Sequence, residues 1–254
     1  MHFNFIYESE PLLAQYLLFH YGEPQDVLPY RFGPHDALDF PVRCVRECLD
    51  GNLLPPQARA LDVGCAVGRG SFELARHCES VTGIDASHKF IMAAIHVKKH
   101  GHIGINRTDE GVLATRCIGK LPEEIKRERV HFEVGDAHRL REDLGAFDVV
   151  CAANLIDRLA EPGQFLQQLP NLVKPGGQLI LTSPYTWMEE FTPQDKWLGG
   201  READGERILT CDALKVVLAP TFELHRTLDL PFLIREHARK YQWSAAQATV
   251  WVRH

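Results

Sequence analysis

The sequence predicts an α/β fold in which a mostly parallel sheet carries helices on both faces. A short apolar run through Leu61 and Val63 ends in a glycine-rich turn, and apolar residues at helical spacing follow from Ser71. Strand, glycine turn and helix form the opening of a βαβ unit, as in Rossmann-like sheets that bind nucleotide-like ligands. Further strand-like runs follow along the chain, at residues 80–85, 130–134, 147–153 and 178–183.

Length and composition indicate one domain. The chain has 254 residues, of which 45% are hydrophobic and 24% charged, the balance of an ordinary globular protein. No linker, repeat or low-complexity segment divides it. We therefore expect a single domain over residues 1–254, in which residues 1–57 form a helical cap and residues 58–254 the core.

Charge and cysteine content restrict the function classes. The net charge of −6 argues against general nucleic-acid binding. The sequence contains no run of about 18 apolar residues, so no membrane span is predicted. The N-terminus lacks the pattern of a signal peptide. Seven cysteines without a C-x-x-C spacing predict reduced thiols in a cytoplasmic protein. The histidines form no ligand-spaced cluster, so no metal site is expected.

Two helices are predicted in the N-terminal segment. Residues 10–21 have apolar side chains at helical spacing, and residues 40–49 have a proline in their first turn. A segment of this kind can cap a cofactor cleft, although packing onto the sheet explains its leucines equally well. Tyr7, Tyr30 and Arg43 are the side chains that we would examine first for a ligand contact.

The glycine turn indicates which cofactor the fold binds. Its spacing differs from the G-x-G-x-x-G of dinucleotide-binding proteins, and Asp62 lies at the end of the strand before the first glycine. This pattern resembles motif I of the class I methyltransferases that use S-adenosylmethionine. The resemblance implies that Asp62 bonds the cofactor's ammonium group, directly or through water. It also implies that the loop faces the methionine part, through Gly64, Cys65, Ala66 and Gly68.

Two further acids follow strand ends at suitable positions. Asp85 lies 23 positions after Asp62 (85 − 62), where a ribose-binding carboxylate belongs, with Ala86 beside it. Alternatively, Asp85, or Ser87 after it, only caps the next helix. In class I methyltransferases a G-D-A stretch after the third strand lines the adenine, and that resemblance assigns this role to Asp136 and Ala137.

Asn154 follows the strand at 147–153, at the edge of the sheet where α/β proteins bind ligands. It is the best single candidate to contact the methyl acceptor, but it is equally able to cap the following helix. Residues 184–207 combine aromatic and acidic side chains, among them Tyr185, Trp187 and Glu189. That combination suits a cationic ligand, while the simpler interpretation is an aromatic plug over the core.

The remaining segments are interpreted structurally. Residues 102–129 are a polar, solvated insertion that is expected to hold a hairpin and a short helix. A helix is predicted at 162–173 and another at 210–218. Strands at 222–230 and 246–252, joined by a crossing at 231–240, fit the antiparallel end of a seven-stranded methyltransferase sheet.

Several stretches together resemble one narrower family, the 4-mercaptohistidine N1-methyltransferases of ovothiol biosynthesis. This family occurs alone or as the C-terminal domain of the iron-dependent sulfoxide synthase that attaches sulfur to histidine, and this chain resembles the stand-alone form. The resemblance implies methyl transfer from S-adenosylmethionine to the π nitrogen of the imidazole, giving ovothiol A and S-adenosylhomocysteine. The stretches are residues 7–22, 40–44, 61–69, 153–159, 183–187, 196–200 and 231–237.

The substrate of that reaction carries carboxylate, ammonium and thiolate groups, and the candidates are chosen to match them. Arg43 or Arg235 would hold the carboxylate, and Asn154 with Tyr185 would orient the ring as the catalytic residues. A strong general base is not required, because an unperturbed imidazole has a pKa of about 6.5. The candidates for the ammonium group are Tyr7, Trp187 and Glu189.

Three alternatives remain at this stage. The chain could methylate another small acid or amine. It could be a non-catalytic partner that binds S-adenosylmethionine and supports the sulfur-inserting enzyme. The third alternative, an NAD-dependent oxidoreductase, conflicts with the glycine spacing and leaves the G-D-A stretch unexplained.

Overall fold

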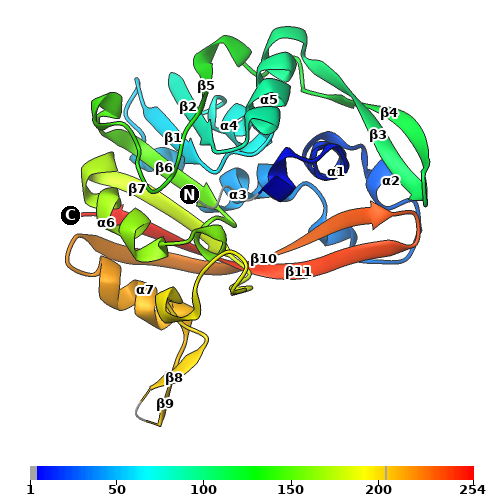
Figure 1. Ribbon diagram of the computed structural model, residues 1–254. Helices are drawn as coiled ribbons and strands as arrows, with labels where there is room; N and C mark the ends of the chain where they lie inside the picture. Colours follow the sequence, from blue (N-terminus) through cyan, green and yellow to red (C-terminus); the bar gives the residue numbers. More distant parts are fainter. Residues whose placement is uncertain (1–4, 204) are drawn as a thin grey trace.

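The computed structural model describes residues 5–203 and 205–254, which are arranged around a seven-stranded sheet (Figure 1). The strand order is β10-β11-β7-β6-β1-β2-β5. Every pairing from β7 to β5 is parallel, whereas β11 is antiparallel to both of its neighbours. The predicted Rossmann-like fold with a mostly parallel sheet is confirmed. The sheet strands are β1 (Arg59–Val63), β2 (Ser80–Asp85), β5 (Val130–Val134), β6 (Phe147–Ala153), β7 (Val173–Ser183), β10 (Phe222–His237) and β11 (Lys240–Arg253).

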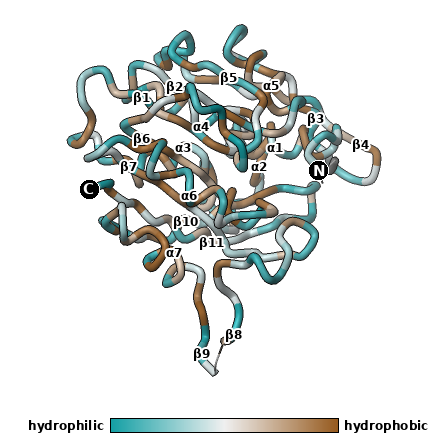
Figure 2. Tube along the Cα trace, turned by 60° about the vertical axis from the view of Figure 1, so that its left-hand side comes forward, coloured by the Kyte–Doolittle hydropathy of each residue, from teal (hydrophilic) through white to brown (hydrophobic). Residues whose placement is uncertain are grey.

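Helices cover both faces of the sheet, because its central strands are apolar on both sides. Ala60 and Val149 face one buried cluster, together with α3, α4 and α5, whereas Leu61 and Val150 face the other, with α6 and α7. Figure 2 shows the hydrophobic strands enclosed between more polar outer segments. The helices are α1 (Glu10–Tyr21), α2 (Pro24–Val27), α3 (Phe40–Cys48), α4 (Arg69–Leu74), α5 (His88–His100), α6 (Pro162–Leu172) and α7 (Thr210–Leu218).

The antiparallel end of the sheet differs from the prediction. Residues 231–240 are not a crossing, because β10 runs on to His237 and pairs with β11 along almost its whole length. Pro231 lies inside β10 opposite Ala245. Proline is tolerated there since β10 is the edge strand of the sheet and a missing N–H costs no ladder bond on the outer side. A proline that suggested a break therefore lies within a continuous strand.

The polar insertion forms the predicted hairpin, with strands β3 (His102–Glu110) and β4 (Leu113–Lys120). The short helix expected there is only a 3₁₀ turn at Arg127–Arg129. The insertion's hairpin bends towards the turn between β10 and β11, where the Ala238 amide donates to the Asp109 carbonyl at 3.1 Å. A second small hairpin, β8 (Arg201–Ala203) with β9 (Glu206–Ile208), projects from the body (Figure 1).

The N-terminal segment is anchored to the loops that leave β1 and β2. Tyr21 at the end of α1 donates its hydroxyl hydrogen to the Val67 carbonyl at 2.6 Å. The first 3₁₀ turn, Phe5–Glu8, is held by a bond of 3.0 Å from the Ser87 hydroxyl to the Tyr7 carbonyl. The segment therefore lies against the edge of the sheet where the parallel strands end.

Candidate active site

Four neighbouring strands end at one edge of the sheet, and each delivers a predicted site residue there. In the order β6-β1-β2-β5, Asn154, Asp62, Asp85 and Asp136 lie at or directly after the ends of the four strands. Asp62 of β1 is in register with Cys151 of β6 and with Gly83 of β2. The chain order reverses beside β1, which is where open α/β sheets bind their ligands.

The turn after β1 needs unusual backbone conformations. Gly64 has φ of 73° and Gly68 has φ of 90°, and Ala66 between them also has a positive φ, 49°. Glycine adopts these values at no steric cost. A Cβ on Gly68 would lie 2.6 Å from the Phe132 ring. The amides of Gly64 and Cys65 donate to the Ile84 carbonyl of β2, which fixes the turn against the neighbouring strand.

Asp62 is a buried acid whose carboxylate is bonded by a neighbouring hydroxyl. The Ser71 hydroxyl donates to its Oδ2 at 2.6 Å, and only 4% of the residue is exposed. Burial raises the pKa of Asp62 to about 6, while the Ser71 hydrogen bond acts in the opposite direction. A cationic group that reached this carboxylate would stabilise its charged form.

Asp85 organises the neighbouring loops with both of its oxygens. Oδ2 accepts from the Ala66 amide and Oδ1 from the Ser87 amide, each at 2.9 Å. Burial raises the pKa of Asp85 to about 6 despite these hydrogen bonds. Ser87, not Asp85, caps α5, since its hydroxyl accepts from the Phe90 amide. Asp85 is thus free of the capping role that was the alternative to ribose binding, and Ala86 beside it is exposed.

Asp136 lies half-exposed at the end of the site that β5 forms. Its Oδ1 accepts from the amide of His138 at 2.9 Å and from Nδ1 of the same residue at 2.7 Å. Ala137 beside it is buried. The arrangement leaves one carboxylate oxygen, Oδ2, available beside a small apolar side chain.

Asn154 does not cap the helix that follows. The next 3₁₀ turn, Ile156–Arg158, has no side-chain cap, and the Asn154 side chain is instead held by β7. The Thr182 hydroxyl donates to Asn154 Oδ1 at 3.0 Å. The backbone N–H of Asn154 donates to the Thr182 carbonyl at 2.8 Å. Asn154 has φ of 51°, a left-handed conformation that is frequent at functional sites and that asparagine tolerates better than most residues.

The aromatic segment after β7 is tied to the body by the polar ends of its rings. The Tyr185 hydroxyl donates to Gln247 Oε1 of β11 at 2.9 Å, and burial raises its pKa. Trp187 Nε1 donates to the Thr210 hydroxyl at 2.9 Å. Glu189 is exposed. Tyr185 also has a positive φ, 53°, so the chain turns sharply directly after β7.

The two arginines proposed for a carboxylate have other partners. Arg43 is buried, and its guanidinium donates to the carbonyls of Leu38 and Pro231. Arg235 donates to the Asp26 carbonyl at 2.8 Å and forms an ion pair with Asp109 at 3.3 Å. Both side chains therefore link β10 to the N-terminal segment or to the insertion.

Sequence reasoning missed an acid–base pair beside Asn154. Asp157 is fully buried, and its Oδ2 accepts from the Thr186 amide at 2.9 Å and from Arg158 Nη1 at 3.1 Å. Arg158 also donates to the Thr186 carbonyl at 2.9 Å, and its guanidinium lies 4.8 Å from the centre of the Phe191 ring. The available signal was the dipeptide Asp157-Arg158, which begins four positions after the end of β6.

The N-terminal segment adds aromatic side chains above this pair. The Tyr7 ring lies 6.4 Å from that of Phe191 and 6.2 Å from that of Tyr16 on α1. His20, one turn further along α1, stacks on Tyr16 at 6.0 Å. Burial and the nearby Arg69 charge lower the pKa of His20 to about 3, so this imidazole is neutral. Tyr7 is thus placed with Phe191, whereas Glu189 is not held in this group.

The described residues fit S-adenosylmethionine. Three acids that could accept from an ammonium group, a diol and an amine lie at or near the ends of three neighbouring strands, beside a turn that contains glycines with positive φ. A carboxylate accepts hydrogen bonds from both hydroxyls of a diol, which suits Asp85. Unpaired positive charge on the ligand would offset the cost of burying Asp62.

Comparison with known proteins gives the class of this domain. Residues 61–181 match the family described as a methyltransferase domain. The chain contains an S-adenosylmethionine-dependent methyltransferase domain. The matched segment runs from β1 to β7 and includes all four strand ends of the candidate site, and S-adenosylmethionine is the cofactor of this class.

Two curated relatives extend the similarity beyond the matched segment. The ubiquinone biosynthesis O-methyltransferase of Caulobacter sp. (strain K31) is 33% identical over 180 residues, which are 67% of this chain and 62% of that protein. The tRNA U34 carboxymethyltransferase of Idiomarina loihiensis is 32% identical over 183 residues, 67% of this chain and 49% of that protein. The alignments thus span about half to three fifths of the relatives' lengths.

Solved structures agree on the fold. The [4+2]-cyclase SpnF has a TM-score of 0.57 with 19% identity, over 96% of this chain and 94% of that one. At this identity the similarity concerns the fold alone, and a fold hosts different chemistries.

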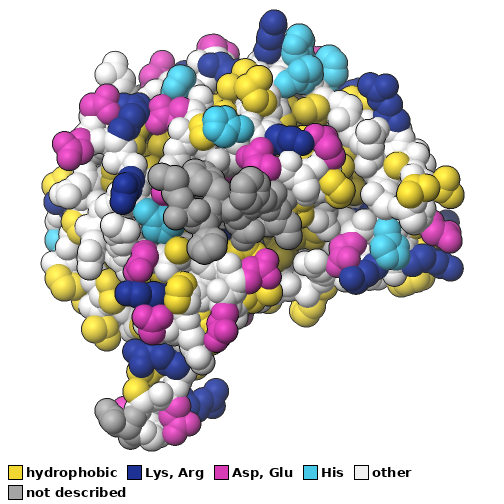
Figure 3. Space-filling view, in the orientation of Figure 1, with side chains coloured by type: hydrophobic (Ala, Val, Ile, Leu, Met, Phe, Trp, Pro, Cys, Tyr) yellow, Lys and Arg dark blue, Asp and Glu magenta, His cyan; other side chains and the backbone are white. Residues whose placement is uncertain are grey.

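Further observations concern membranes, metals and surface charge. Within residues 5–203 and 205–254, no helix is long and apolar enough to cross a membrane. The same residues contain no group of three or more His, Cys, Asp or Glu side chains arranged to hold a metal ion. Figure 3 shows cationic and anionic side chains interspersed over one face of the molecule.

Proposed function

We propose that this chain transfers the methyl group of S-adenosylmethionine to the π nitrogen of the imidazole of 4-mercaptohistidine, giving ovothiol A and S-adenosylhomocysteine. One observation carries the proposal. Three of the stretches that resemble the ovothiol family, residues 7–22, 153–159 and 183–187, contact one another or share a neighbour beside the cofactor residues. These stretches would form the acceptor side of the site.

The chain's own residues would hold the cofactor through its polar groups. Asp62 would accept from the ammonium, Asp85 from the ribose hydroxyls and Asp136 from the adenine amine, with Ala137 beside the ring. Gly64, Cys65, Ala66, Gly68 and Ala86 would supply backbone that approaches the ligand closely. When bound, S-adenosylmethionine supplies a methyl group activated by a positively charged sulfur.

Asn154 would orient the acceptor ring. Thr182 fixes Oδ1 of its amide, so the orientation of the amide is set and Nδ2 is the donor left for the substrate. Tyr185 would form the opposite wall, because its hydroxyl is tied to Gln247 and its ring remains as the contact surface. Trp187 and Glu189 would contribute at the rim of the site, and Tyr7 would contact the ammonium group from above.

Arg158 is the arginine that we favour for the substrate carboxylate. It lies between Asp157, Thr186 and Phe191, whereas Arg43 is occupied by carbonyl groups and Arg235 borders a separate cavity. Only Nη1 of Arg158 is engaged in the hydrogen bonds described above. The other guanidinium nitrogens can form the paired hydrogen bonds that a carboxylate accepts.

The main requirement of the reaction is that the acceptor nitrogen, the methyl group and the sulfonium sulfur are aligned. Orientation of two reactants can supply about 7–11 kcal/mol of the barrier. The acceptor imidazole has an ordinary pKa of about 6.5, so its nitrogen is mostly unprotonated at neutral pH without a strong base. On this proposal the chain acts as a single cytoplasmic domain, with residues 1–57 as its cap. It uses the product of an iron-dependent sulfoxide synthase.

The test is incubation of the purified chain with S-adenosylmethionine and either 4-mercaptohistidine or histidine, followed by mass spectrometry and fragmentation. One added methyl group on the imidazole of the thiolated substrate alone is the expected result. Product from neither substrate, while S-adenosylhomocysteine still binds, would overturn the substrate assignment. It would leave methyl transfer to another small acid or amine, or a non-catalytic role in binding the cofactor.

A further inference from the structure

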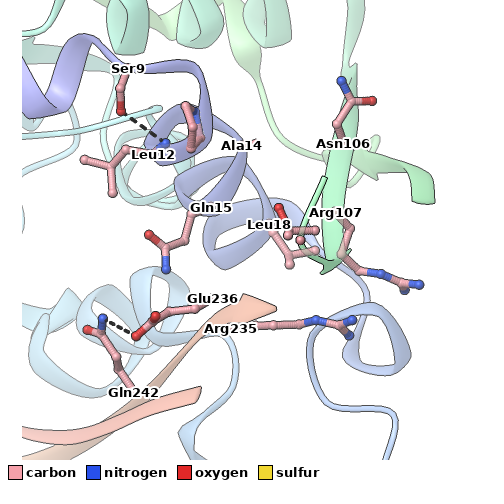
Figure 4. Close-up of a pocket in the computed structure, with 13 residues that line it drawn as sticks. Ser9, Leu12, Ala14, Gln15, Leu18, Asn106, Arg107, Arg235, Glu236 and Gln242 are labelled. Atoms are coloured by element: carbon pink, nitrogen blue, oxygen red, sulfur yellow. Dashed lines mark hydrogen bonds between the residues drawn. The ribbon is translucent and has the colours of Figure 1, made fainter. Parts of the chain in front are cut away.

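A cavity of about 500 Å³ lies beside α1. Gln15 and Leu18 of α1 line it, whereas Tyr16 and His20 lie on a different face of the same helix. The other walls are β3 and the end of the β10–β11 hairpin (Figure 4). We call this cavity the outer pocket. Asn154, Tyr185 and Trp187 are not among its lining residues.

Two extensions of the fold build the outer pocket. The β3–β4 hairpin is the insertion between α5 and β5, and β11 continues past the part that pairs with β7, residues 247–252. The tips of the two hairpins are joined by the hydrogen bond from Ala238 to Asp109. Neither extension is needed to complete the sheet, and together they enclose a space beside α1.

Opposite charges border this space because of an irregularity in β10. Consecutive residues of a strand normally point to opposite faces, yet Arg235 and Glu236 both line the pocket. The pairing of β10 with β11 shifts register between Arg235 and His237. Irregularities of this kind redirect side chains and are frequent beside functional sites.

Arg235 lies at the border of the pocket with its terminal nitrogens bonded to neighbouring segments. Only 4% of the residue is exposed, and Asp26 and Asp109 occupy its two terminal nitrogens. Its buried Nε has no hydrogen-bond partner among the residues that the structure describes. The guanidinium keeps its positive charge at the border of the pocket, and this charge favours an anionic group of a ligand there.

Glu236 is held in its charged form. Its carboxylate accepts from Lys240 at 2.7 Å and from Gln242 at 2.8 Å. Both bonds lower the pKa of Glu236, and the bond from Lys240 has the larger effect. The carboxylate can accept further hydrogen bonds. Gln15 and Asn106 add side-chain amides to the lining, and Figure 4 shows Gln15 directed towards Glu236 and Gln242.

We propose that the outer pocket binds a free α-amino acid with a polar side chain. The ammonium group would lie at Glu236 and the carboxylate at the Arg235 side, while the amides of Gln15 and Asn106 would contact the polar side chain. The cavity volume lies within the usual range for small-ligand sites, about 300–1,000 Å³. This inference goes beyond the proposed methyl transfer and does not depend on it.

The test is a binding measurement with the cofactor site blocked. The full chain, saturated with S-adenosylhomocysteine, is titrated with L-histidine and L-glutamine by ligand-observed NMR and calorimetry. Imidazolepropionate, which lacks the ammonium group, and histamine, which lacks the carboxylate, are the matched probes. We expect saturable binding of at least one of the two amino acids. Imidazolepropionate and histamine should each bind at least about tenfold more weakly.

Variants separate this pocket from the acceptor site. Glu236→Gln and Gln15→Leu are each expected to weaken amino-acid binding about tenfold, whereas Asn154→Gly leaves it unchanged. Gln15→Leu removes no charge, so it serves where Glu236→Gln disturbs folding. Absence of binding by both amino acids overturns the proposal. So does binding that survives both pocket variants, or binding that Asn154→Gly abolishes. Methylated product is not a readout, so failure of the proposed function would remain distinguishable.

Discussion

The proposed cofactor side and the proposed acceptor side of the candidate active site are built in different ways. On the cofactor side, Asp62 and Asp85 end adjacent parallel strands, and their partners lie 2 to 19 positions away in the chain. On the acceptor side, Asp157 is joined to Thr186 over 29 positions and Tyr185 to Gln247 over 62. The first side is therefore a property of local strand–turn units, whereas the second exists only once distant segments have packed.

The largest expected effect is on the cofactor side. Asp85→Ala leaves the amides of Ala66 and Ser87 without their acceptor and removes the carboxylate proposed for ribose. We expect affinity for S-adenosylhomocysteine, measured by calorimetry, to fall by about 100-fold or more. Asp143→Ala, at an exposed acid, is the control and should bind normally. Nearly unchanged affinity in Asp85→Ala would remove the distinction between the two sides.

The glycine turn gives the next largest effect, this time on stability. Gly68→Ala places a Cβ 2.6 Å from the Phe132 ring at φ of 90°. The combined strain and crowding should lower the free energy of unfolding by about 2–4 kcal/mol in urea titration. Gly163→Ala is the matched control, since its added Cβ meets nothing within 4 Å. Equal stability of the two variants would show that the turn adapts and does not require glycine.

Asn154→Gly tests the acceptor side without forcing a new backbone conformation, because glycine accepts φ of 51°. Turnover of 4-mercaptohistidine should fall by about 10- to 100-fold through loss of orientation. Affinity for S-adenosylhomocysteine should change far less. If cofactor affinity and turnover fall together, Asn154 belongs to the cofactor side and the acceptor assignment is wrong.

The smallest effect expected is a pH dependence. Asp62 and Asp85 have pKa values raised to about 6, so each is increasingly protonated below that pH. Binding of a cationic ligand requires the charged carboxylate, so affinity should rise with pH up to about 7 and then level off. For one linked proton the limit is about tenfold per pH unit. Calorimetry in two buffers of different ionisation enthalpy should show proton release below pH 6.

That dependence also separates the two sides. Asp62→Asn should flatten the part of the pH profile that arises from this acid, which we propose for the ammonium group, whereas Asn154→Gly should leave the profile unchanged. An unaltered profile in Asp62→Asn would assign the linked proton to Asp85 alone.

The raised pKa values have an opposite consequence for the unliganded fold. Between about pH 4 and 6 the folded chain binds more protons than the unfolded chain, so its stability falls as the pH rises.

Prediction from the sequence succeeded where a motif coincides with a strand end. The spacing of Asp62, Gly64 and Asp85 predicted a site that the sheet order does bring together. Their roles towards a ligand remain predictions. Prediction from the sequence failed for the β10–β11 hairpin, because Pro231 suggested a break. Only the edge position of β10 explains why the strand continues through this proline. Sequence reasoning also passed over Asp157 and Arg158, whose partners are defined by packing.

The sequence by itself determined the parallel βα units and their loops, because strand periodicity, glycine conformation and acid spacing act over a few residues. Only the tertiary structure decided that Arg158 bonds the segment after β7 at Thr186, and that Arg235 borders a different cavity. The physical reason is that a side chain's surroundings come from segments that are remote in the chain. Nothing in the local pattern around an arginine distinguishes a guanidinium held by carbonyl groups from one with nitrogens left for a ligand.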